Sequence, residues 1–551
     1  MTPRRIAAAV LVLFLGAAGS FSRSAQPAKA QSSNEDLVTL ACSIPHEHLL
    51  RTFRGWRPDR GAQISFIAKE PNFVGSGLPH VGPWDYIQTV PMLWYGPGFI
   101  QARGNVKRPV TVADIAPTTA DLLRFDGFTA HDGTLMDEAL VPADQRETPK
   151  LLVTMVWDAG GMNVLRAHPT AWPYLRSIIS EGTFYTDATV GSSPSSTAQI
   201  HATIGTGSFP RQHGLVGHNM LVGDTITAPW NQGPAFFVEP TLADIYDRAM
   251  DNDPIVGIVA TADIHFGLLG HGGFFTGGDR DIALTRSVVD PETLTDEGSE
   301  WNLPEHDAPY YRLPDYANDV PGFEDDVATL DQADGKKDGK WRDNDIAELL
   351  DGFDTPARTP YQERVVETVV QREGFGRDET PDLLYLNFKE IDYVSHVWSM
   401  NSVEMRDAVV AQDEALEALV TALNRDVGKN QWVLNITADH GAMPDPAVSG
   451  GYQISTRPMQ DLINGEFDTD GDDTPVVDLM QPTQAFLNTD ELESNGASVD
   501  DVARFMMTFT QNQTAGGGVE PNAGQENDTV MRAAFPSSLM PDLPCLPEAR
   551  R

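Results

Sequence analysis

The chain has 551 residues, 41% of them apolar, which is enough to build a sizeable core in one large domain or several small ones. Lys and Arg total 39 against 79 Asp and Glu, so the net charge is −40 at pH 7. This acidity argues against stable binding to nucleic acid or to anionic membranes, and it is typical of a secreted or salt-adapted protein. Nothing in the composition indicates an oligomeric state.

The first thirty residues have the pattern of a signal peptide. Arg4 and Arg5 precede the apolar stretch Ile6–Ala18, and Ala28-Lys29-Ala30 fits a small-x-small cleavage site. The stretch is too short to span a bilayer and no comparable one follows, so no membrane insertion is expected. We expect residues 1–30 to be removed and the mature chain, starting near Gln31, to be secreted into an extracellular or periplasmic compartment.

The only two cysteines, Cys42 and Cys545, lie near the two ends of the mature chain. An even number of cysteines in an exported protein predicts a disulfide, with two free thiols as the alternative. Reduction of this bridge is expected to loosen the chain ends before it affects a site in the core.

Short apolar runs rich in β-branched and aromatic residues predict buried strands, and segments with apolar residues three and four apart predict helices between them. Alternation of strands and helices indicates an α/β fold with a mostly parallel sheet covered by helices on both faces. The expected strands are 63–68, 90–95, 151–157, 254–260, 383–388 and 432–437, and the clearest helices are 111–123, where Thr111 and Asp114 resemble a capping box, and 404–424.

Two acidic segments have no strong periodicity. Residues 290–358 are rich in Pro, Asp and Gly, and they predict an insertion over the core that either shapes a substrate pocket or is a plain surface loop. Residues 468–473 are similar to a calcium loop, but the glycine is misplaced and no glutamate stands at the twelfth position, so calcium binding is not favoured there.

Metal-binding residue types follow several predicted strands. Asp158 closes one apolar run, Asp439 and His440 follow another, and Asp392 and His396 stand four apart, on one face if that segment is helical. Carboxylate and imidazole groups suit zinc or a similar divalent cation. Each pair alone is more typical of a structural role. Because ligands bind beyond the carboxyl ends of parallel strands, their common context indicates one metal-containing site.

A further segment carries a more specific pattern. Pro194-Ser195-Ser196-Thr197 is followed by His201, Thr206-Gly207, Pro210 and His213-Gly214. This order resembles the nucleophile segment of the nucleotide pyrophosphatase/phosphodiesterase branch of the alkaline phosphatase superfamily. The resemblance implies an alkaline-phosphatase-like fold in which Thr197 is the nucleophile, with Ser195 and Ser196 as alternatives. A hydroxyl needs a bound cation to react as an alkoxide at neutral pH.

The resemblance also implies a ligand set for two Zn²⁺ ions, with other divalent ions possible. One metal is expected to bind Asp158, Thr197, Asp439 and His440, and the other Asp392, His396 and a histidine that the family places late in the chain. No histidine follows His440 here. His80, in a block that resembles the closing segment of the superfamily, is the candidate, which implies a circular permutation. Residues 31–147 would then be the relocated C-terminal segment and 148–551 the main part of the same catalytic domain, with 290–358 as its acidic insertion. A Cys42–Cys545 bridge would rejoin the ends near the original cut.

The asparagine that steadies a phosphoryl oxygen in the family is expected where His218 stands, with Asn219 one residue later. Asn219 is preferred, and His218 is the alternative donor. His201 and His213 are expected to brace the segment, whereas His265 and His271 would line a pocket wall or lie in an ordinary loop. The remaining histidines are interpreted as surface residues: His46, His48, His131, His168 and His306.

The combined pattern predicts a secreted, metal-dependent phosphatase or phosphodiesterase acting on a phosphate ester or nucleotide. The alternatives are a phosphonate hydrolase on the same site and a catalytically silent, metal-bound extracellular protein. A sulfatase is disfavoured because Ser196 stands where that class has arginine. The choice between monoester and diester substrates stays open.

Overall fold

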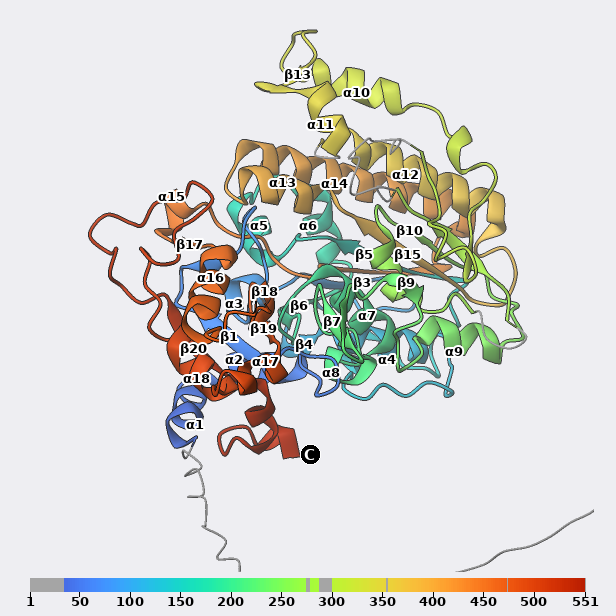
Figure 1. Ribbon diagram of the computed structural model, residues 1–551. Helices are drawn as coiled ribbons and strands as arrows, with labels where there is room; N and C mark the ends of the chain where they lie inside the picture. Colours follow the sequence, from blue (N-terminus) through green and yellow to red (C-terminus); the bar gives the residue numbers. More distant parts are fainter. Residues whose placement is uncertain (1–33, 274–277, 287–299, 353–354, 473, 551) are drawn as a thin grey trace, which may run out of the picture.

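The computed structural model describes residues 34–273, 278–286, 300–352, 355–472 and 474–550. The expected signal peptide, residues 1–30, lies outside them. The largest sheet has nine strands in the order β12-β11-β10-β15-β5-β16-β3-β6-β4 (Figure 1). At its centre, β5 (Leu151–Trp157) pairs in parallel with β15 (Asp382–Phe388) on one side and β16 (Trp432–Thr437) on the other. All three strands are completely buried, as their continuous apolar runs predict.

The sheet is parallel except at one strand. β3 (Met92–Tyr95) runs antiparallel to both of its neighbours, β16 and β6 (Thr183–Thr189), whereas the other described pairings are parallel. The fold is therefore the expected α/β class with a mostly parallel sheet. Its remaining strands are β4 (Gly104–Thr111), β10 (Val256–Val259), β11 (Asp281–Leu284) and β12 (Tyr311–Arg312).

Helices cover both faces, and the alternation of side chains along β5 explains why. Leu151, Val153 and Met155 join a core cluster with apolar residues of α12 (Arg358–Val369) and α14 (Val403–Leu423). Leu152 and Val156 point to the opposite face. On that face they pack with residues of three other helices, α4 (Ile115–Leu122), α7 (Thr197–Thr206) and α9 (Leu242–Ala249).

Both predicted helices form. α14 covers almost the whole of the expected segment, and the Ser402 side chain caps its first turn by accepting from Met405 N. The segment 111–123 forms a 3₁₀ turn, η1 (Val112–Asp114), followed by α4. Thr111 N donates to the Asp114 carboxylate at 2.7 Å, which is one half of the expected capping box.

A second, smaller sheet is antiparallel and joins the two ends of the described chain. Its order is β18 (Val477–Gln481), β19 (Gln484–Leu487), β1 (Ile64–Ala68) and β20 (Met531–Pro536). The apolar run at 63–68 was expected to contribute to the mostly parallel sheet, and it forms a strand in this other sheet instead. The reason is that its partners, the β18–β19 hairpin and β20, lie more than 400 residues away in sequence, where no local pattern specifies them.

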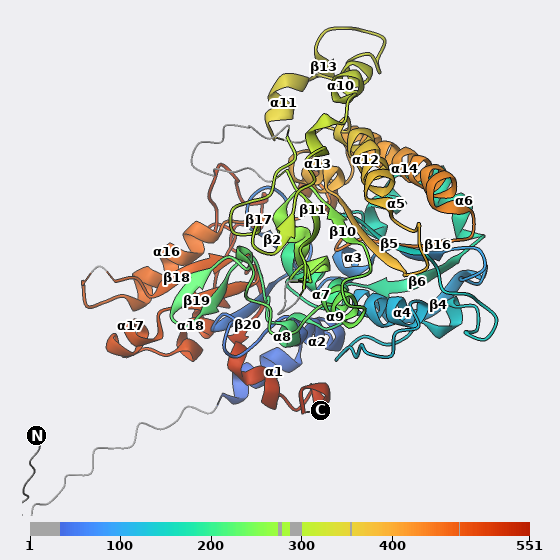
Figure 2. The same cartoon turned by 90° about the vertical axis from the view of Figure 1, so that its right-hand side faces the viewer.

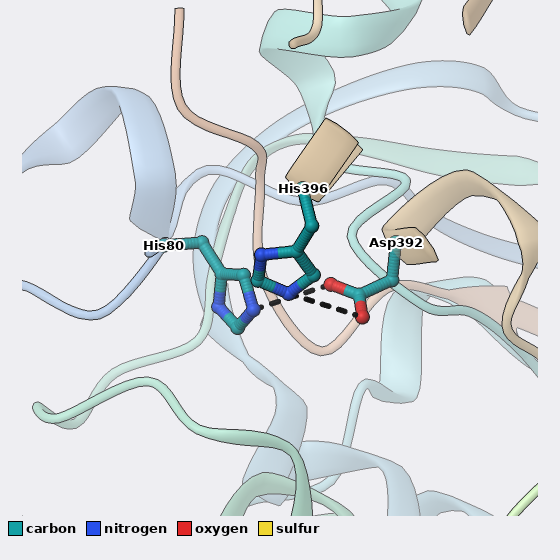
Figure 3. Close-up of side chains that lie close together, drawn as sticks. All are labelled: His80, Asp392 and His396. Atoms are coloured by element: carbon teal, nitrogen blue, oxygen red, sulfur yellow. Dashed lines mark ion pairs between the residues drawn. The ribbon is translucent and has the colours of Figure 1, made fainter. Parts of the chain in front are cut away.

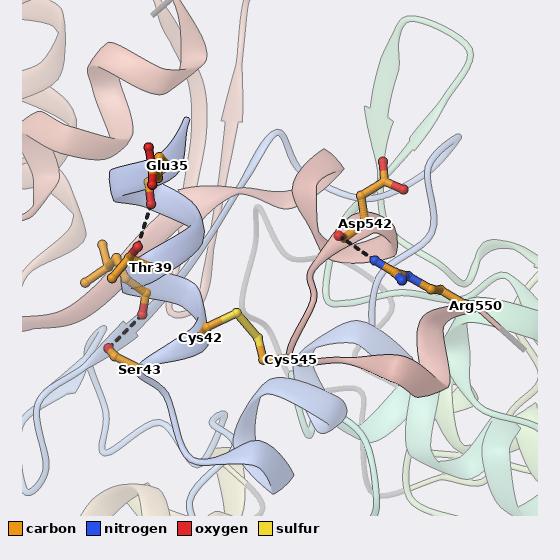
Figure 4. Close-up of a disulfide and its surroundings, with 8 residues drawn as sticks. Glu35, Thr39, Cys42, Ser43, Asp542, Cys545 and Arg550 are labelled. Atoms are coloured by element: carbon orange, nitrogen blue, oxygen red, sulfur yellow. Dashed lines mark hydrogen bonds between the residues drawn. A yellow bond between two sulfur atoms is a disulfide. The ribbon is translucent and has the colours of Figure 1, made fainter. Parts of the chain in front are cut away.

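The N-terminal helix and the C-terminus lie side by side, as both Figure 1 and Figure 2 show. The predicted disulfide is present: Cys42, at the end of α1 (Glu35–Cys42), is bonded to Cys545 with a Cα–Cα distance of 5.6 Å (Figure 4). Arg504 of α18 (Val499–Met506) adds an ion pair to Asp36 at 2.7 Å. These contacts close the two ends of the described chain onto each other.

The acidic segment 290–358 is described from residue 300 onward. Its β12 is the edge strand of the main sheet, while α10 (Phe323–Asp331), β13 (Lys340–Trp341), β14 (Asn344–Asp345) and α11 (Ile346–Gly352) project beyond α12 and α14 (Figures 1 and 2). In the acidic loop at 468–473, Asp470 and Asp472 are exposed. Within the described ranges, no helix is both long and apolar enough to cross a membrane.

Candidate active site

The predicted site residues converge where the central parallel strands end. Asp158 directly follows β5, Asp439 and His440 follow β16, and β15 leads into α13 (Glu390–Trp398), which carries Asp392 and His396. Four of these side chains are almost completely buried: Asp158, Asp392, Asp439 and His440. The helical spacing expected for Asp392 and His396 is confirmed.

One cluster consists of His80, Asp392 and His396 (Figure 3). His80 Nε2 lies 3.2 Å from Asp392 Oδ1, and His396 Nε2 lies 3.5 Å from Asp392 Oδ2. His396 Nδ1–H donates to the Gly77 carbonyl at 2.5 Å, which fixes the ring so that Nε2 faces the carboxylate. The structure thus brings a histidine from the N-terminal block to residues more than 300 positions later.

A second cluster surrounds the end of β16. Asp439 Oδ2 lies 3.1 Å from His440 Nε2, and that nitrogen is 3.7 Å from Asp158 Oδ1. The other Asp439 oxygen accepts from Ala159 N at 3.0 Å. The His80 and His440 rings stack with centroids 3.6 Å apart, so the two clusters are adjacent.

Thr197 is the first residue of α7 and is almost completely buried. Its hydroxyl oxygen lies 3.3 Å from the ammonium of Lys389. The two alternative nucleophiles are hydrogen-bonded elsewhere: Ser195 Oγ donates to the His80 carbonyl at 3.1 Å and Ser196 Oγ to Gln199 Oε1 at 3.0 Å. Thr197 is therefore the hydroxyl of the segment that faces the clustered charges.

Lys389 is a site residue that the sequence analysis missed. Its Nζ lies 2.9 Å from Asp158 Oδ1 and 2.7 Å from Asp392 Oδ2, so it joins the two clusters in addition to contacting Thr197. The side chain is buried. The available signal was a lysine that directly follows the mostly apolar run 383–388, three residues before Asp392, a place where a solvated lysine is not expected.

Further side chains hold Asp158 in place. Asn387 Nδ2 donates to Asp158 Oδ2 at 3.0 Å and to His201 Nε2 at 2.9 Å, while His201 Nδ1–H donates to the Thr197 carbonyl at 2.8 Å. His265 Nε2 lies 3.2 Å from Asp158 Oδ2. His201 therefore braces the segment as expected, and so does His213, which bonds to Thr203 Oγ1 at 3.1 Å.

One expectation about the histidines needs correction. His265 belongs neither to a pocket wall nor to an ordinary loop, because it is fully buried in the 3₁₀ turn η3 (Asp263–Leu268) against Asp158. His271 lies in a turn, which agrees with the loop alternative, and its ring is 3.1 Å from the Asp244 carboxylate.

The electrostatics keep the carboxylates charged and His80 neutral. Burial opposes ionisation of Asp158 and Asp392, but the Lys389 ammonium outweighs it and holds the pKa of both carboxyls below the usual range. Burial, together with the neighbouring His440, lowers the pKa of His80 to about 4. A neutral imidazole at neutral pH is the form that binds a metal.

Several buried nitrogen and oxygen atoms form at most an ion-pair contact, and no hydrogen bond, in the described chain. They are all of types that bind divalent cations, and a buried polar atom without a partner costs about 1–3 kcal/mol. The unsatisfied atoms are His80 Nδ1, Asp392 Oδ1, Asp439 Oδ2 and His440 Nε2. The residues present thus fit the binding of metal ions.

The two candidates for contact with a phosphoryl oxygen, His218 and Asn219, differ in exposure. His218 is exposed to solvent, although the protein around it lowers its pKa to about 4, with contributions from Lys389 and His440. Asn219 is half-buried and has no side-chain hydrogen bond to the site residues among those described.

Buried carboxylates, imidazoles and a hydroxyl at the carboxyl end of a parallel sheet define a metal-dependent hydrolase site. Residues 152–545 match the family described as type I phosphodiesterase / nucleotide pyrophosphatase. The chain belongs to this family, a class of metal-dependent phosphohydrolases, which confirms the expected alkaline phosphatase superfamily.

Individual relatives are distant. A protein named calcium-transporting ATPase from Myroides odoratus is 21% identical over 66% of this chain and 74% of its own length. Alkaline phosphatase PafA from Elizabethkingia meningoseptica is 23% identical over 28% of this chain and 29% of its own. The crystal structure of wild-type PafA covers 70% of this chain and 84% of the PafA chain, with 16% identity and a TM-score of 0.49. The crystal structure of phosphonoacetate hydrolase from Sinorhizobium meliloti covers 54% of this chain and 58% of the hydrolase chain, with 17% identity and a TM-score of 0.31.

Proposed function

We propose that the protein is a secreted phosphoric ester hydrolase in which Thr197 is the nucleophile and two divalent cations, zinc by preference, complete the site. The observation that carries this proposal is the position of the buried Thr197 hydroxyl, 3.3 Å from Lys389 Nζ where the two clusters of ligand types meet.

The residues suited to hold the cations form two sets. One consists of Asp158, Asp439 and His440 with the Thr197 oxygen, and the other of His80, Asp392 and His396. Bound divalent cations lower the pKa of a hydroxyl and stabilise negative charge on a leaving oxygen.

Lys389 changes the charge of the site. Three carboxylates and a threonine alkoxide carry four negative charges, which two divalent cations would balance. Asp158 and Asp392 outweigh the burial of Lys389 and raise its pKa, so that it stays protonated and adds one positive charge. A net positive site attracts an anionic ester locally, although the whole chain carries a charge of −40.

The reaction follows from these positions. Thr197 Oγ gives up its proton and attacks phosphorus, the P–O bond to the leaving alcohol breaks with its electron pair on the leaving oxygen, that oxygen takes up a proton, and a phosphothreonine forms. Water then attacks phosphorus, the P–O bond to Thr197 breaks, and a proton from the water returns to Thr197 Oγ. The product is phosphate from a monoester and a phosphate monoester from a diester. Lys389 Nζ donates a hydrogen bond to the developing oxyanion. Asn219 is the candidate for a second donor to a phosphoryl oxygen, and His218 is the alternative.

The substrate class is a small phosphate ester or a nucleotide. The test compares kcat/KM of the zinc-loaded protein for p-nitrophenyl phosphate and bis-p-nitrophenyl phosphate, with a p-nitrophenyl phosphonate as a third substrate. If kcat/KM is larger for p-nitrophenyl phosphate than for bis-p-nitrophenyl phosphate, the protein is a phosphatase. If it is smaller, the protein is a phosphodiesterase. Preference for the phosphonate would select the alternative hydrolase. A folded protein with two metals and no turnover of any ester would support the catalytically silent alternative.

We also propose that the chain is circularly permuted. The matched family region begins at residue 152, so that His80 lies outside it, and β3 of the N-terminal block occupies the sheet beside β16. The bonded pair Cys42–Cys545 brings the ends within reach of a short linker. A reordered chain that begins at Thr148 and is joined through such a linker from the present C-terminus to Asn34 is expected to fold and keep its activity. Failure of the reordered chain to fold would contradict the permutation.

Export by a signal peptide at residues 1–30 is part of the proposal. The disulfide supports an oxidising compartment. Mass spectrometry of the protein released by its host is expected to find a mature chain that starts near Gln31. A retained Met1 would refute export by this route.

A further inference from the structure

A second group of carboxylates lies at the opposite end of the parallel strands, where β11 (Asp281–Leu284) begins. Asp281 begins β11, whereas the hydrolase site lies where the parallel strands end. Asp247 in α9 and the exposed Asp279 lie beside it, and one oxygen from each of the three residues lies within 4.8 Å of the others. This cluster has no role in the proposed hydrolysis.

Asp247 is the unusual member of the cluster. Its side chain is completely buried, and neither carboxylate oxygen has a hydrogen-bond partner in the described part of the chain. Asp281 is also buried, and its Oδ2 has no partner among the described residues. A buried charge without a partner is costly, and buried charges in proteins are otherwise paired or bind a metal.

The neighbouring groups do not neutralise these two carboxylates. Asp244, one turn earlier in α9, is hydrogen-bonded to His271 and Thr241. It is itself a carboxylate, so it adds negative charge to the cluster instead of balancing it. Arg312, on the adjacent strand, is paired with Glu373 at 2.7 Å. Burial and repulsion from Asp279 and Asp244 raise the pKa of Asp247 to about 7, and burial together with Asp247 raises the pKa of Asp281 well above its usual range.

The spacing of the oxygens fits one hard cation. Two ligands on opposite sides of Ca²⁺ lie about 4.6–5.2 Å apart, because each bond is about 2.3–2.6 Å long. The backbone also turns closely around the site: Gly273 has φ +69°, and a Cβ there would lie 2.6 Å from Asp247 Oδ2. All the available donors are oxygens, and the nearby His271 ring is held by Asp244, which disfavours zinc.

We propose that Asp247, Asp279 and Asp281 form a calcium site that ties α9 to the start of β11. Its role is structural, because it stands apart from the residues that contact Thr197. The solvent-exposed Asp279 provides the entrance for the ion.

The test is equilibrium dialysis of the full mature protein with ⁴⁵Ca²⁺, in the presence of zinc so that the hydrolase site stays loaded. The wild type is expected to bind one Ca²⁺ per chain, and Asp247→Asn and Asp281→Asn to weaken that binding at least tenfold. Asp470→Asn, in the exposed loop that is similar to a calcium loop, is the matched control and is expected to bind Ca²⁺ as the wild type does.

A thermal unfolding series separates folding failure from loss of the ion. Ca²⁺ is expected to raise the Tm of the wild type by a few degrees and that of Asp247→Asn not at all, with kcat/KM unchanged in both. Equal Tm shifts in the wild type and Asp247→Asn would overturn the site. So would a wild type that binds no Ca²⁺, or one in which Mg²⁺ competes equally.

Discussion

Lys389 Nζ lies 3.3 Å from the hydroxyl oxygen of Thr197. The same ammonium contacts a carboxylate from each of the two ligand clusters, Asp158 and Asp392. The site therefore contains a fixed cation of its own, in addition to any metal that it binds. This cation is supplied by the residue that connects β15 to α13.

Lys389→Met is expected to lower kcat/KM about 10²–10³-fold, because it removes a fixed donor from the place where negative charge develops. The metal content, measured by elemental analysis, is expected to stay at the wild-type value. Lys429→Met changes an exposed lysine and serves as the control. Unchanged kcat/KM in Lys389→Met would show that the ammonium has no part in the reaction.

His80→Ala is expected to reduce the metal content from about two ions per chain to about one. The His80 imidazole is one of the three candidate metal ligands in its cluster. It is buried, so a solvent-exposed side chain is not expected to take its place as a ligand. His131→Ala, at an exposed position, is the control. Two tightly bound ions in the His80→Ala protein would mean that the N-terminal block does not complete the site.

The stability of the fold is expected to fall as the pH drops below neutrality, and His213 contributes to this. Burial lowers its pKa from 6.5 to about 3, and Leu215 N donates to its Nδ1, which leaves no place for a second proton. As the pH falls, His213 of the unfolded chain is therefore protonated at a higher pH than His213 of the folded chain. This costs about 1.4 kcal/mol of unfolding free energy per pH unit between about pH 6.5 and 3.

Urea unfolding at pH 7 and pH 5 measures this contribution. His213→Gln is expected to lose less stability between the two pH values than the wild type does, although it is less stable at pH 7. His131→Gln, at an exposed position, is expected to follow the wild type. Parallel pH dependences for His213→Gln and the wild type would contradict the assignment.

The double variant Cys42→Ser/Cys545→Ser is expected to lose about 2–5 kcal/mol of unfolding free energy, because the bridge restricts a very long loop in the unfolded chain. Activity at 25 °C is expected to persist, since the bridge joins α1 to the C-terminal turns rather than the site strands. The check combines urea unfolding with kcat/KM. Loss of bound metal at 25 °C would instead couple the bridge to the site.

The central strands and the acidic residues after them are predictable from the sequence. Unbroken apolar runs such as Leu151–Trp157 specify buried parallel strands, and polar residues at their ends belong to a site. β4 escaped prediction because Lys107, Arg108 and Pro109 interrupt an edge strand that is half exposed. The partners of β1 are distant in sequence, so their identity depends on tertiary packing.

Lys389 and the Asp247 cluster were missed for a related reason. Lysine and aspartate are usually solvated, and nothing local distinguishes one buried Asp among the 79 Asp and Glu of this chain. Asp247 and Asp281 come together only because α9 packs beside the start of β11. Burial of such residues is a property of the fold and not of their neighbours in sequence.

The central claim is that Thr197 carries the phosphoryl group during turnover. The most direct measurement is acid quenching of the zinc-loaded protein during steady-state hydrolysis of a phosphate ester, followed by peptide mass spectrometry. Phosphate is expected on Thr197 and none in Thr197→Ala, and that variant is expected to lose turnover although it keeps its fold. Full activity of Thr197→Ala, or phosphate on another residue such as Ser195, would contradict it.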